Sequence, residues 1–246
     1  MNISPSLIAL NNIYSEYLKI IIILGTLGVL IGIALHYLLI GPNAKKLGQL
    51  KPDLKRLTLL ERVTHFIRMI SCIFLTITGL GFAILNFNSI GISYKPVYNI
   101  HILFAMLFGL SSLVSLIIWF KDSFFQRYDW QWFKVMGGYL TRKEIHPPSG
   151  KFNAGQKAFY WYSTLLSILI ITSGYILVYN ESFSLEALIW ATIIHGLGSI
   201  ALIAGVIAHA YLGSFANPGT IGTIFHGKVA KEWAKSHHPN WYQELR

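Results

Sequence analysis

The sequence predicts an all-α integral membrane protein with five transmembrane helices. Of its 246 residues, 54% are hydrophobic and only 12% are charged, which is about half the charged share of a typical soluble domain. Several apolar runs approach the roughly 20 residues that a helix needs to cross the hydrocarbon core of a bilayer. These runs lack the period-two alternation of membrane β-strands. We therefore expect a polytopic helical bundle and exclude a soluble globular enzyme.

The first predicted span covers residues 18–40 and ends at Gly41-Pro42. No basic cluster precedes it and no A-x-A-like site follows it, so we do not expect a cleaved secretory signal. It contains His36, which we interpret as a packing or interfacial histidine because no partner at its depth is evident. Residues 1–45 are thus predicted to form an extra N-terminal transmembrane helix.

The remaining spans are predicted to form a four-helix bundle over residues 46–215. They cover residues 64–85, 100–120, 158–179 and 188–212, and a polar cytoplasmic tail over 216–246 follows them. The single cysteine, Cys72, lies in the first of these four spans and is expected to be a small buried hydrophobe. One cysteine excludes both an internal disulfide and a cysteine-bound iron–sulfur cluster within this chain.

Basic residues alternate between the loops. Segment 43–62 holds six Lys/Arg, segment 121–157 holds seven and the tail holds four, whereas residues 1–17 and 180–186 hold none and 86–99 holds one. The positive-inside rule therefore predicts an N-terminus outside and a C-terminus in the cytoplasm, across the inner membrane of a bacterium. The net charge of +10 is explained by this topology and does not indicate nucleic-acid binding.

Four histidines are expected inside the spans at two depths. His195 and His209 are 14 residues apart, which on a helix is roughly 21 Å of rise and about 40° short of four full turns, so both lie on one face. His65 starts its span at the cytoplasmic side, and His101 starts its span at the outer side. The topology therefore pairs His101 with His195 near the outer surface and His65 with His209 near the inner surface.

Two facing imidazoles at equal depth are a ligand set that suits haem iron. A single interfacial histidine is often only a packing residue, but a histidine well inside a span is costly and indicates function. A proton relay usually includes Asp or Glu, and no predicted span contains an internal acid. A zinc site needs converging ligands, which a separation of roughly 21 Å along one helix prevents. All four histidines are therefore predicted to be axial ligands of two haem b groups.

Three stretches carry a family resemblance: ERVTHFIRMISCIFLTITGL (61–80), GKFNAGQKAFYW (150–161) and GKVAKEWAKSHHPNWY (227–242). Through them, residues 60–246 resemble the gamma subunit of membrane-bound respiratory formate dehydrogenase, a di-haem cytochrome b556. The first 45 or so residues fall outside the resemblance, because the short members of that family have four helices.

The resemblance implies a subunit that transfers electrons and reduces quinone, not the subunit that oxidises formate. In the family, a periplasm-facing alpha subunit with a molybdenum or tungsten pterin cofactor oxidises formate, and an iron–sulfur beta subunit passes on the electrons. The outer haem, at His101 and His195, would receive them. The inner haem, at His65 and His209, would carry them across the bilayer, where menaquinone or ubiquinone is reduced near the cytoplasmic side.

The resemblance also implies a quinone site beside the inner haem. Asn153, Gly155 and Gln156 are the positions carried over as quinone-binding, with Lys157 as a neighbour. Amide groups can hydrogen-bond a quinone carbonyl, and glycine allows close approach of the backbone. Taken without the resemblance, the same residues are better explained as an N-terminal helix cap on Asn153. The tail histidines, which are His226, His237 and His238, are expected at the surface.

Three alternatives remain open at this stage. The same architecture could serve a nickel–iron hydrogenase or a thiosulfate or polysulfide reductase as its cytochrome b subunit. A transporter could use histidine protonation, and a haem assay would distinguish it. A purely structural membrane anchor would retain quinone-linked electron flow after replacement of His65 or His101.

Overall fold

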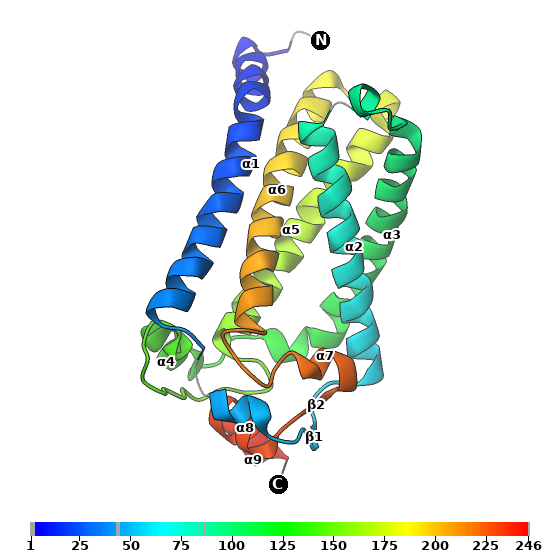
Figure 1. Cartoon of the computed structure of the whole chain (residues 1–246). Helices are drawn as coiled ribbons and strands as arrows, with labels where there is room; N and C mark the ends of the chain where they lie inside the picture. The colour runs from blue at the N-terminus through cyan, green and yellow to red at the C-terminus, as the bar shows by residue number, and fades with distance from the viewer. Residues whose placement is uncertain (1–2, 43–44, 86, 246) are drawn as a thin grey trace. The chain divides into compact units, whose positions relative to one another are not determined.

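The computed structural model describes residues 3–42, 45–85 and 87–245 (Figure 1). Within them, the helices long and apolar enough to cross a membrane are α1 (Pro5–Leu39), α2 (Leu59–Ile84), α3 (Tyr94–Trp119), α5 (Ala154–Val178) and α6 (Leu185–Leu212). The predicted all-α membrane fold with five spans is confirmed. Asn43, Ala44 and Asn86, which belong to two of the predicted loops, lie outside the described residues.

The helices begin earlier than the hydropathy of the sequence indicated. Helix α1 starts at Pro5 and has 35 residues, whereas the predicted span started at residue 18. Helices α2 and α3 start at Leu59 and Tyr94, again ahead of the predicted 64 and 100. Hydropathy detects only the stretch that suits hydrocarbon. The backbone hydrogen bonds of a helix continue into polar sequence beyond that stretch.

Short elements lie between the long helices and after the last of them. They are the helices α4 (Asp129–Val135), α7 (Gly222–His226), α8 (Lys231–His237) and α9 (Pro239–Glu244), five 3₁₀ turns (Lys45–Gln49, Phe87–Ile90, Lys121–Ser123, Met136–Gly138 and Asn180–Ser182), and the strands β1 (Leu54–Lys55) and β2 (Lys228–Val229). The two strands pair antiparallel, with Leu54 opposite Val229 and Lys55 opposite Lys228. This pairing ties the segment before α2 to the segment after α6.

The chain divides into two compact units, and each of the five long helices contributes to both. Unit 1 contains Met1–Gly28, Ile67–Ser112 and Ser163–Ala204. Unit 2 contains Val29–Phe66, Leu113–Tyr162 and Gly205–Arg246. These units are defined by packing, so the predicted division of the sequence into 1–45, 46–215 and 216–246 stays a prediction.

In unit 1, the extra helix α1 packs closely against α6. The Tyr14 side chain is only 7% exposed, and its hydroxyl occupies the space that a Cβ on Gly196 would need. A Cβ on Gly25 would lie 3.2 Å from Cγ2 of Ile200. Small residues at these positions let the two helices approach each other, as is common between membrane helices.

In unit 2, the C-terminal segment is folded around its own apolar cluster. The cluster consists of Val229, Ala230, Trp233, Ala234 and Trp241, all at most 7% exposed. The expectation that the tail histidines lie at the surface is therefore wrong for His238, which is 0% exposed. It holds for His226, which is exposed, whereas His237 is only partly exposed. The apolar positions of this segment are few and separated by charged residues, so its composition resembles that of a solvated tail.

Candidate functional site

In unit 1, α3 and α6 bring His101 and His195 to face each other. Their ring centroids are 6.4 Å apart, and the ring planes are inclined by 57°. Small residues flank both rings, since a Cβ on Gly79 would lie 3.7 Å from Cε1 of His101 and a Cβ on Gly174 only 3.1 Å from Cε1 of His195. Larger side chains at these glycines would narrow the space around the two imidazoles.

Hydrogen bonds at the Nδ1 atoms fix the protonation of this pair. The Thr78 hydroxyl donates to Phe74 O at 2.7 Å, so it accepts the proton of His101 Nδ1, which lies 2.7 Å away. His195 Nδ1 donates to Ile170 O at 3.1 Å, with the Ser173 hydroxyl at 3.3 Å. Each ring therefore carries its proton on Nδ1 and presents the Nε2 lone pair, which is the form that binds a metal.

In unit 2, α2 and α6 bring together the second pair, His65 and His209. Their ring centroids are 6.3 Å apart, and the ring planes are inclined by 43°. Phe159 of α5 stacks on the His209 ring at 4.2 Å and 7°, which holds the imidazole in one orientation. Helix α6 thus contributes one histidine to each pair, as the spacing of His195 and His209 predicted.

The spacing of both pairs fits one iron between two imidazoles. A bond between a metal and an imidazole nitrogen is about 2.0 Å, so the centroids of two rings that shared one metal would lie about 6 Å apart. The observed separations are 6.4 Å and 6.3 Å. Over the described part of the chain, no group of three or more His, Cys, Asp and Glu side chains could hold a metal ion. The geometry therefore suits a metal that needs only two protein ligands, such as haem iron.

His36 is a packing histidine, as predicted, but it does have partners. Its Nε2 donates to Tyr139 O at 2.8 Å, so its Nδ1 accepts from the Tyr211 hydroxyl at 2.7 Å. Both partners are more than 100 residues away in the sequence, which is why none was evident there. These bonds attach α1 to the rest of unit 2.

Sequence reasoning missed Arg68, which lies in the membrane-spanning helix α2. In unit 1 its Nη2 donates to the Ser167 hydroxyl at 3.1 Å and lies 3.5 Å from Ser163 O. Its guanidinium also lies 5.5 Å from the centre of the Phe108 ring. A charged side chain inside a span is costly and usually functional. The lone Arg within an apolar run was the signal in the sequence.

The predicted quinone-binding residues form the N-terminal cap of α5. Asn153 N donates to Gln156 Oε1 at 3.0 Å, and Gln156 N donates to Asn153 Oδ1 at 2.9 Å. This reciprocal arrangement is a capping box. The helix cap on Asn153, which the residues indicated without the resemblance, is therefore observed. Because both amide oxygens accept cap hydrogen bonds, the amide NH₂ groups are the parts left to donate to a ligand.

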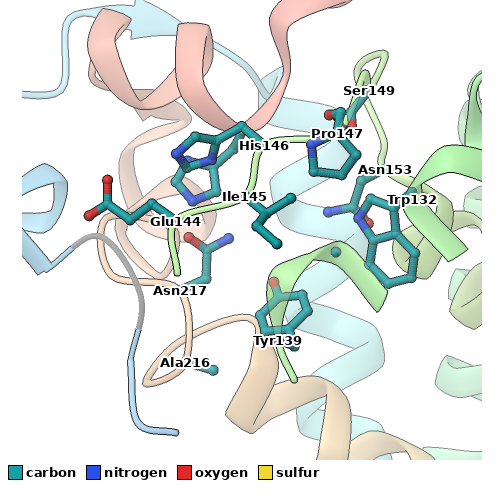
Figure 2. A pocket seen from close by; sticks show the side chains of 12 residues that line it. Trp132, Tyr139, Glu144, Ile145, His146, Pro147, Ser149, Asn153, Ala216 and Asn217 are labelled. Carbon is teal, nitrogen blue, oxygen red and sulfur yellow. Dashed lines mark hydrogen bonds between the residues drawn. The ribbon is translucent and has the colours of Figure 1, made fainter. Parts of the chain in front are cut away.

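A pocket in unit 2 lies beside this cap (Figure 2). Its lining includes Asn153, Trp132, Tyr139 and Asn217. The Trp132 ring is 8% exposed and needs glycine on two sides, since a Cβ on Gly155 would lie 2.6 Å from it. Gly137, with φ of 61°, would place a Cβ 2.5 Å from the same ring. Gly155 is therefore required for the packing of Trp132, independently of any role in quinone binding.

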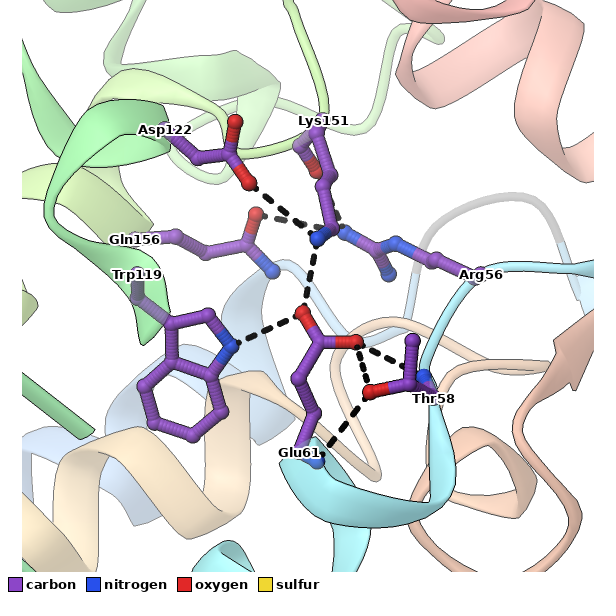
Figure 3. A network of polar contacts seen from close by, with 7 residues as sticks. All are labelled: Arg56, Thr58, Glu61, Trp119, Asp122, Lys151 and Gln156. Atoms are coloured by element: carbon purple, nitrogen blue, oxygen red, sulfur yellow. Dashed lines mark hydrogen bonds and ion pairs between the residues drawn. The ribbon is translucent and has the colours of Figure 1, made fainter. Parts of the chain in front are cut away.

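Polar side chains at the start of α2 meet the same loop (Figure 3). Lys151 Nζ lies 2.7 Å from Glu61 Oε1 and 3.1 Å from Asp122 Oδ2. Glu61 Oε1 also accepts from Trp119 Nε1 at 3.1 Å, and its other oxygen accepts from Thr58 N at 2.7 Å. The loop before α5 is therefore attached to α2 and α3 through one shared carboxylate.

Lys157, expected only as a neighbour of the quinone residues, forms a buried ion pair. Its Nζ lies 2.7 Å from Asp129 Oδ2, and both side chains are 2% exposed. Asp129 Oδ2 also accepts from Gln126 N at 2.6 Å. Removing one partner of an ion pair buried to this extent strongly destabilises a folded protein, because the other charge stays buried and unpaired. Lys157 therefore anchors α5 to α4.

Paired imidazoles from separate apolar helices are the ligand set expected of a membrane cytochrome b, a class of protein that holds haem inside the bilayer. Residues 56–227 match the family described as prokaryotic cytochrome b561. The chain belongs to this family, and it is accordingly an integral membrane electron-transfer protein that binds haem b.

Similar proteins carry a more specific name. The chain is 28% identical over 197 residues to the formate dehydrogenase cytochrome b556(fdo) subunit of Escherichia coli K12, covering 78% of this chain and 92% of that one. It is 29% identical to the formate dehydrogenase cytochrome b556 subunit of Haemophilus influenzae, covering 74% and 79%. A shorter match, 33% over 99 residues, is to the nitrate-inducible cytochrome b556(Fdn) subunit of Escherichia coli K12, covering 39% and 45%.

Proposed function

We propose that this chain is the cytochrome b subunit of a respiratory formate dehydrogenase. It carries electrons from a periplasm-facing iron–sulfur subunit across the bacterial inner membrane and delivers them to quinone near the cytoplasmic side. The observation that carries this proposal is the pair of facing imidazole couples, with centroids 6.4 Å and 6.3 Å apart. The names of the similar proteins support formate as the source of the electrons.

In this proposal the chain holds two haem b groups, one between His101 and His195 and one between His65 and His209. Haem b, when bound, supplies reversible one-electron oxidation and reduction. The residues of the chain orient the haem ligands and shield the haem sites. Thr78 and Ile170 keep the Nδ1 protons in place on the first pair, and a lipid-facing apolar bundle excludes water from both sites.

The quinone is proposed to bind near His65 and His209, beside Asn153, Gly155 and Gln156. Reduction of a quinone to its quinol takes two electrons, which come from the donor, and two protons, which come from cytoplasmic water. The amide NH₂ of Asn153 is available to a quinone carbonyl because its oxygen is held by Gln156 N. Menaquinone and ubiquinone both present such carbonyls.

The proposed orientation has the N-terminus outside and the C-terminus in the cytoplasm. It rests on the three basic segments, which would all face the cytoplasm. The His101–His195 pair would then lie nearer the iron–sulfur beta subunit, which in turn receives electrons from a molybdenum or tungsten pterin alpha subunit. With formate oxidised outside and protons consumed inside, electron flow would be electrogenic.

Haem counting in histidine variants tests the proposal. Wild-type protein should contain two haems per chain by the pyridine haemochromogen assay. His101→Ala and His195→Ala should each lose the same haem, and His65→Ala and His209→Ala should each lose the other. His36→Ala, the matched control, should keep both. Losses that do not follow these pairs would overturn the assignment of ligands.

A second measurement tests the reaction. Formate should reduce both haems in the complete complex, and a soluble menaquinone analogue such as menadione should reoxidise them. Reduction by hydrogen or by a sulfur compound, with formate inactive, would instead favour the cytochrome b of a hydrogenase or of a thiosulfate or polysulfide reductase.

A further inference from the structure

The C-terminal segment of unit 2 holds the loop before α5 by its backbone. Ser149 O accepts from two backbone N–H groups, Asn240 at 3.2 Å and Trp241 at 3.4 Å. The next carbonyl, Gly150 O, lies 2.7 Å from His238 Nδ1. Two consecutive carbonyls just ahead of the α5 cap are thus fixed by residues from the far end of the chain.

Arg56 continues this series of contacts (Figure 3). One of its terminal nitrogens, Nη2, donates to Lys151 O at 3.0 Å. The same nitrogen lies 3.0 Å from His238 Nε2, which the figure does not draw. The same nitrogen lies 3.4 Å from Gln156 Oε1, one of the two cap acceptors. Nη2 carries only two hydrogens, and its contacts to Lys151 O and His238 Nε2 are the shorter ones. The bond to Gln156 is therefore the weakest of the three.

These contacts require a neutral His238. Its Nδ1 proton is donated to Gly150 O, so its Nε2 must accept the proton of Arg56 Nη2. The ring is 0% exposed, and burial together with the Arg56 charge holds the His238 pKa well below its usual value. His238 therefore links the loop to Arg56 as a fixed donor and acceptor, not as a titrating group.

The placement of Arg56 is costly. The side chain is 7% exposed, and its guanidinium stacks at 4.8 Å on the Trp233 ring. In the described structure its Nε is buried without a hydrogen-bond partner. Burial lowers the Arg56 pKa to about 10. The three groups that face Nη2 are a carbonyl, an amide and an imidazole, and the nearby Glu61 charge offsets the effect of burial on the pKa only in part.

A capping box between Asn153 and Gln156 closes through its own two hydrogen bonds and does not require this buried cation. We propose that Arg56 and His238 are positioning residues for quinone reduction. They hold segment 149–156, which is the end of the loop and the first turn of α5, so that the Asn153 amide is kept in place against a quinone carbonyl. This inference rests on the quinone site of the proposed function. Displacements of about 1 Å in such a site can lower rates by about 10²-fold.

The test uses the complete complex in detergent, with its haems reduced by stoichiometric dithionite and then mixed rapidly with menadione. His238→Leu removes both ring nitrogens, and Arg56→Gln removes the guanidinium group. We expect the second-order rate of haem reoxidation by menadione to fall about 10- to 100-fold in both. Haem spectra, midpoint potentials and reoxidation by ferricyanide should stay unchanged, because the haem ligands are not touched.

His238→Asn is the conservative variant, since its amide NH₂ takes the place of Nδ1 and can donate to Gly150 O, which keeps the direct bond to the loop. It should retain a rate within about threefold of wild type. Lys231→Ala is the matched control in the same segment, because the Lys231 ion pair with Asp53 is exposed and does not contact the loop. If His238→Leu fails to fold, His238→Gln replaces it, because its longer side chain reaches Arg56 but leaves Gly150 O without its donor.

The outcomes separate the two proposals. If menadione does not reoxidise the haems of wild-type protein, the proposed quinone-reducing function is wrong. If wild type reacts and the folded Arg56 and His238 variants react at the same rate, the positioning role alone is wrong. A fall that affects ferricyanide and menadione equally would also contradict it, because such a fall reports general damage.

Discussion

At the scale of single residues, the Nδ1 partners of the histidines distinguish two otherwise similar ligands. Within the described residues, His101 Nδ1 bonds the Thr78 hydroxyl, whereas His195 Nδ1 has both Ile170 O and the Ser173 hydroxyl. Partners of this kind fix the orientation of a metal-binding imidazole, and their loss typically lowers metal affinity about 10- to 100-fold. The two rings should therefore differ in their sensitivity to the loss of one hydroxyl.

Thr78→Val should weaken haem retention and shift the midpoint potential of the haem proposed for His101 and His195. Valine has nearly the shape of threonine but leaves the Nδ1 proton without an acceptor, at a cost of about 1–3 kcal/mol. Haem content after detergent washing and optical redox titration measure these effects. Ser173→Ala is the matched control, since Ile170 O remains. Equal effects in the two variants would contradict the argument.

At the scale of elements, the tightest approach of the extra helix α1 to α6 in unit 1 is at Gly196. Gly196→Ala should weaken the packing of α1 on α6, because the new Cβ would collide with the Tyr14 hydroxyl, and overpacking costs about 1–3 kcal/mol. Thermal unfolding in detergent and proteolysis of α1 report the change. Tyr14→Phe should partly restore stability in the double variant. Gly28→Ala, where a Cβ meets nothing within 4 Å, should not destabilise the protein.

The C-terminal segment should lose stability in mild acid. Burial, together with the nearby His146 and Arg56, lowers the His237 pKa to about 4, and the His238 pKa is lowered too. The unfolded segment binds these protons near pH 6.5, but the folded segment does not. Stability is therefore complete above pH 6.5 and declines as pH falls toward 4.

Amide exchange over residues 228–241, followed from pH 7 to pH 4, measures this decline. His237 stacks on Trp233 with ring centroids 4.9 Å apart, and His237→Phe keeps an aromatic ring there. This variant should remove part of the pH dependence of the exchange rate. His226→Asn changes an exposed histidine and should leave it unaltered. If the exchange rate follows only the intrinsic pH dependence of amide exchange from pH 7 to pH 4, the predicted loss of stability through His237 and His238 is wrong.

At the scale of the whole molecule, hydropathy and charge were enough to predict the five spans and the way the four histidine rings pair. The cap at Asn153 was also predictable, because it depends on residues three apart. What the sequence could not indicate was contact between distant segments. The Arg56–His238 contact joins residues 182 apart, and the Tyr211–His36 contact joins residues 175 apart.

The C-terminal segment shows the physical reason for this difference. Periodicity reports which face of a single helix is apolar, but Trp233 and Trp241 belong to helices of only six or seven residues. Such short helices hold too few turns for a pattern to emerge. Their burial depends on complementary surfaces from β1 and the loop before α5, which no local window of sequence contains.

Membrane orientation is the property of the whole molecule on which the direction of electron flow depends. The proposed topology predicts that a cysteine at Ser6 is labelled from outside intact spheroplasts by a membrane-impermeant maleimide. A cysteine at Ser236 should be labelled only after permeabilisation. The native Cys72 is the single cysteine of the sequence and is partly buried on α2, less so than predicted, so Cys72→Ala provides the background. The opposite labelling pattern would place the His65–His209 pair at the outer surface and quinone reduction with it. Electrons from an outside donor would then not cross the membrane.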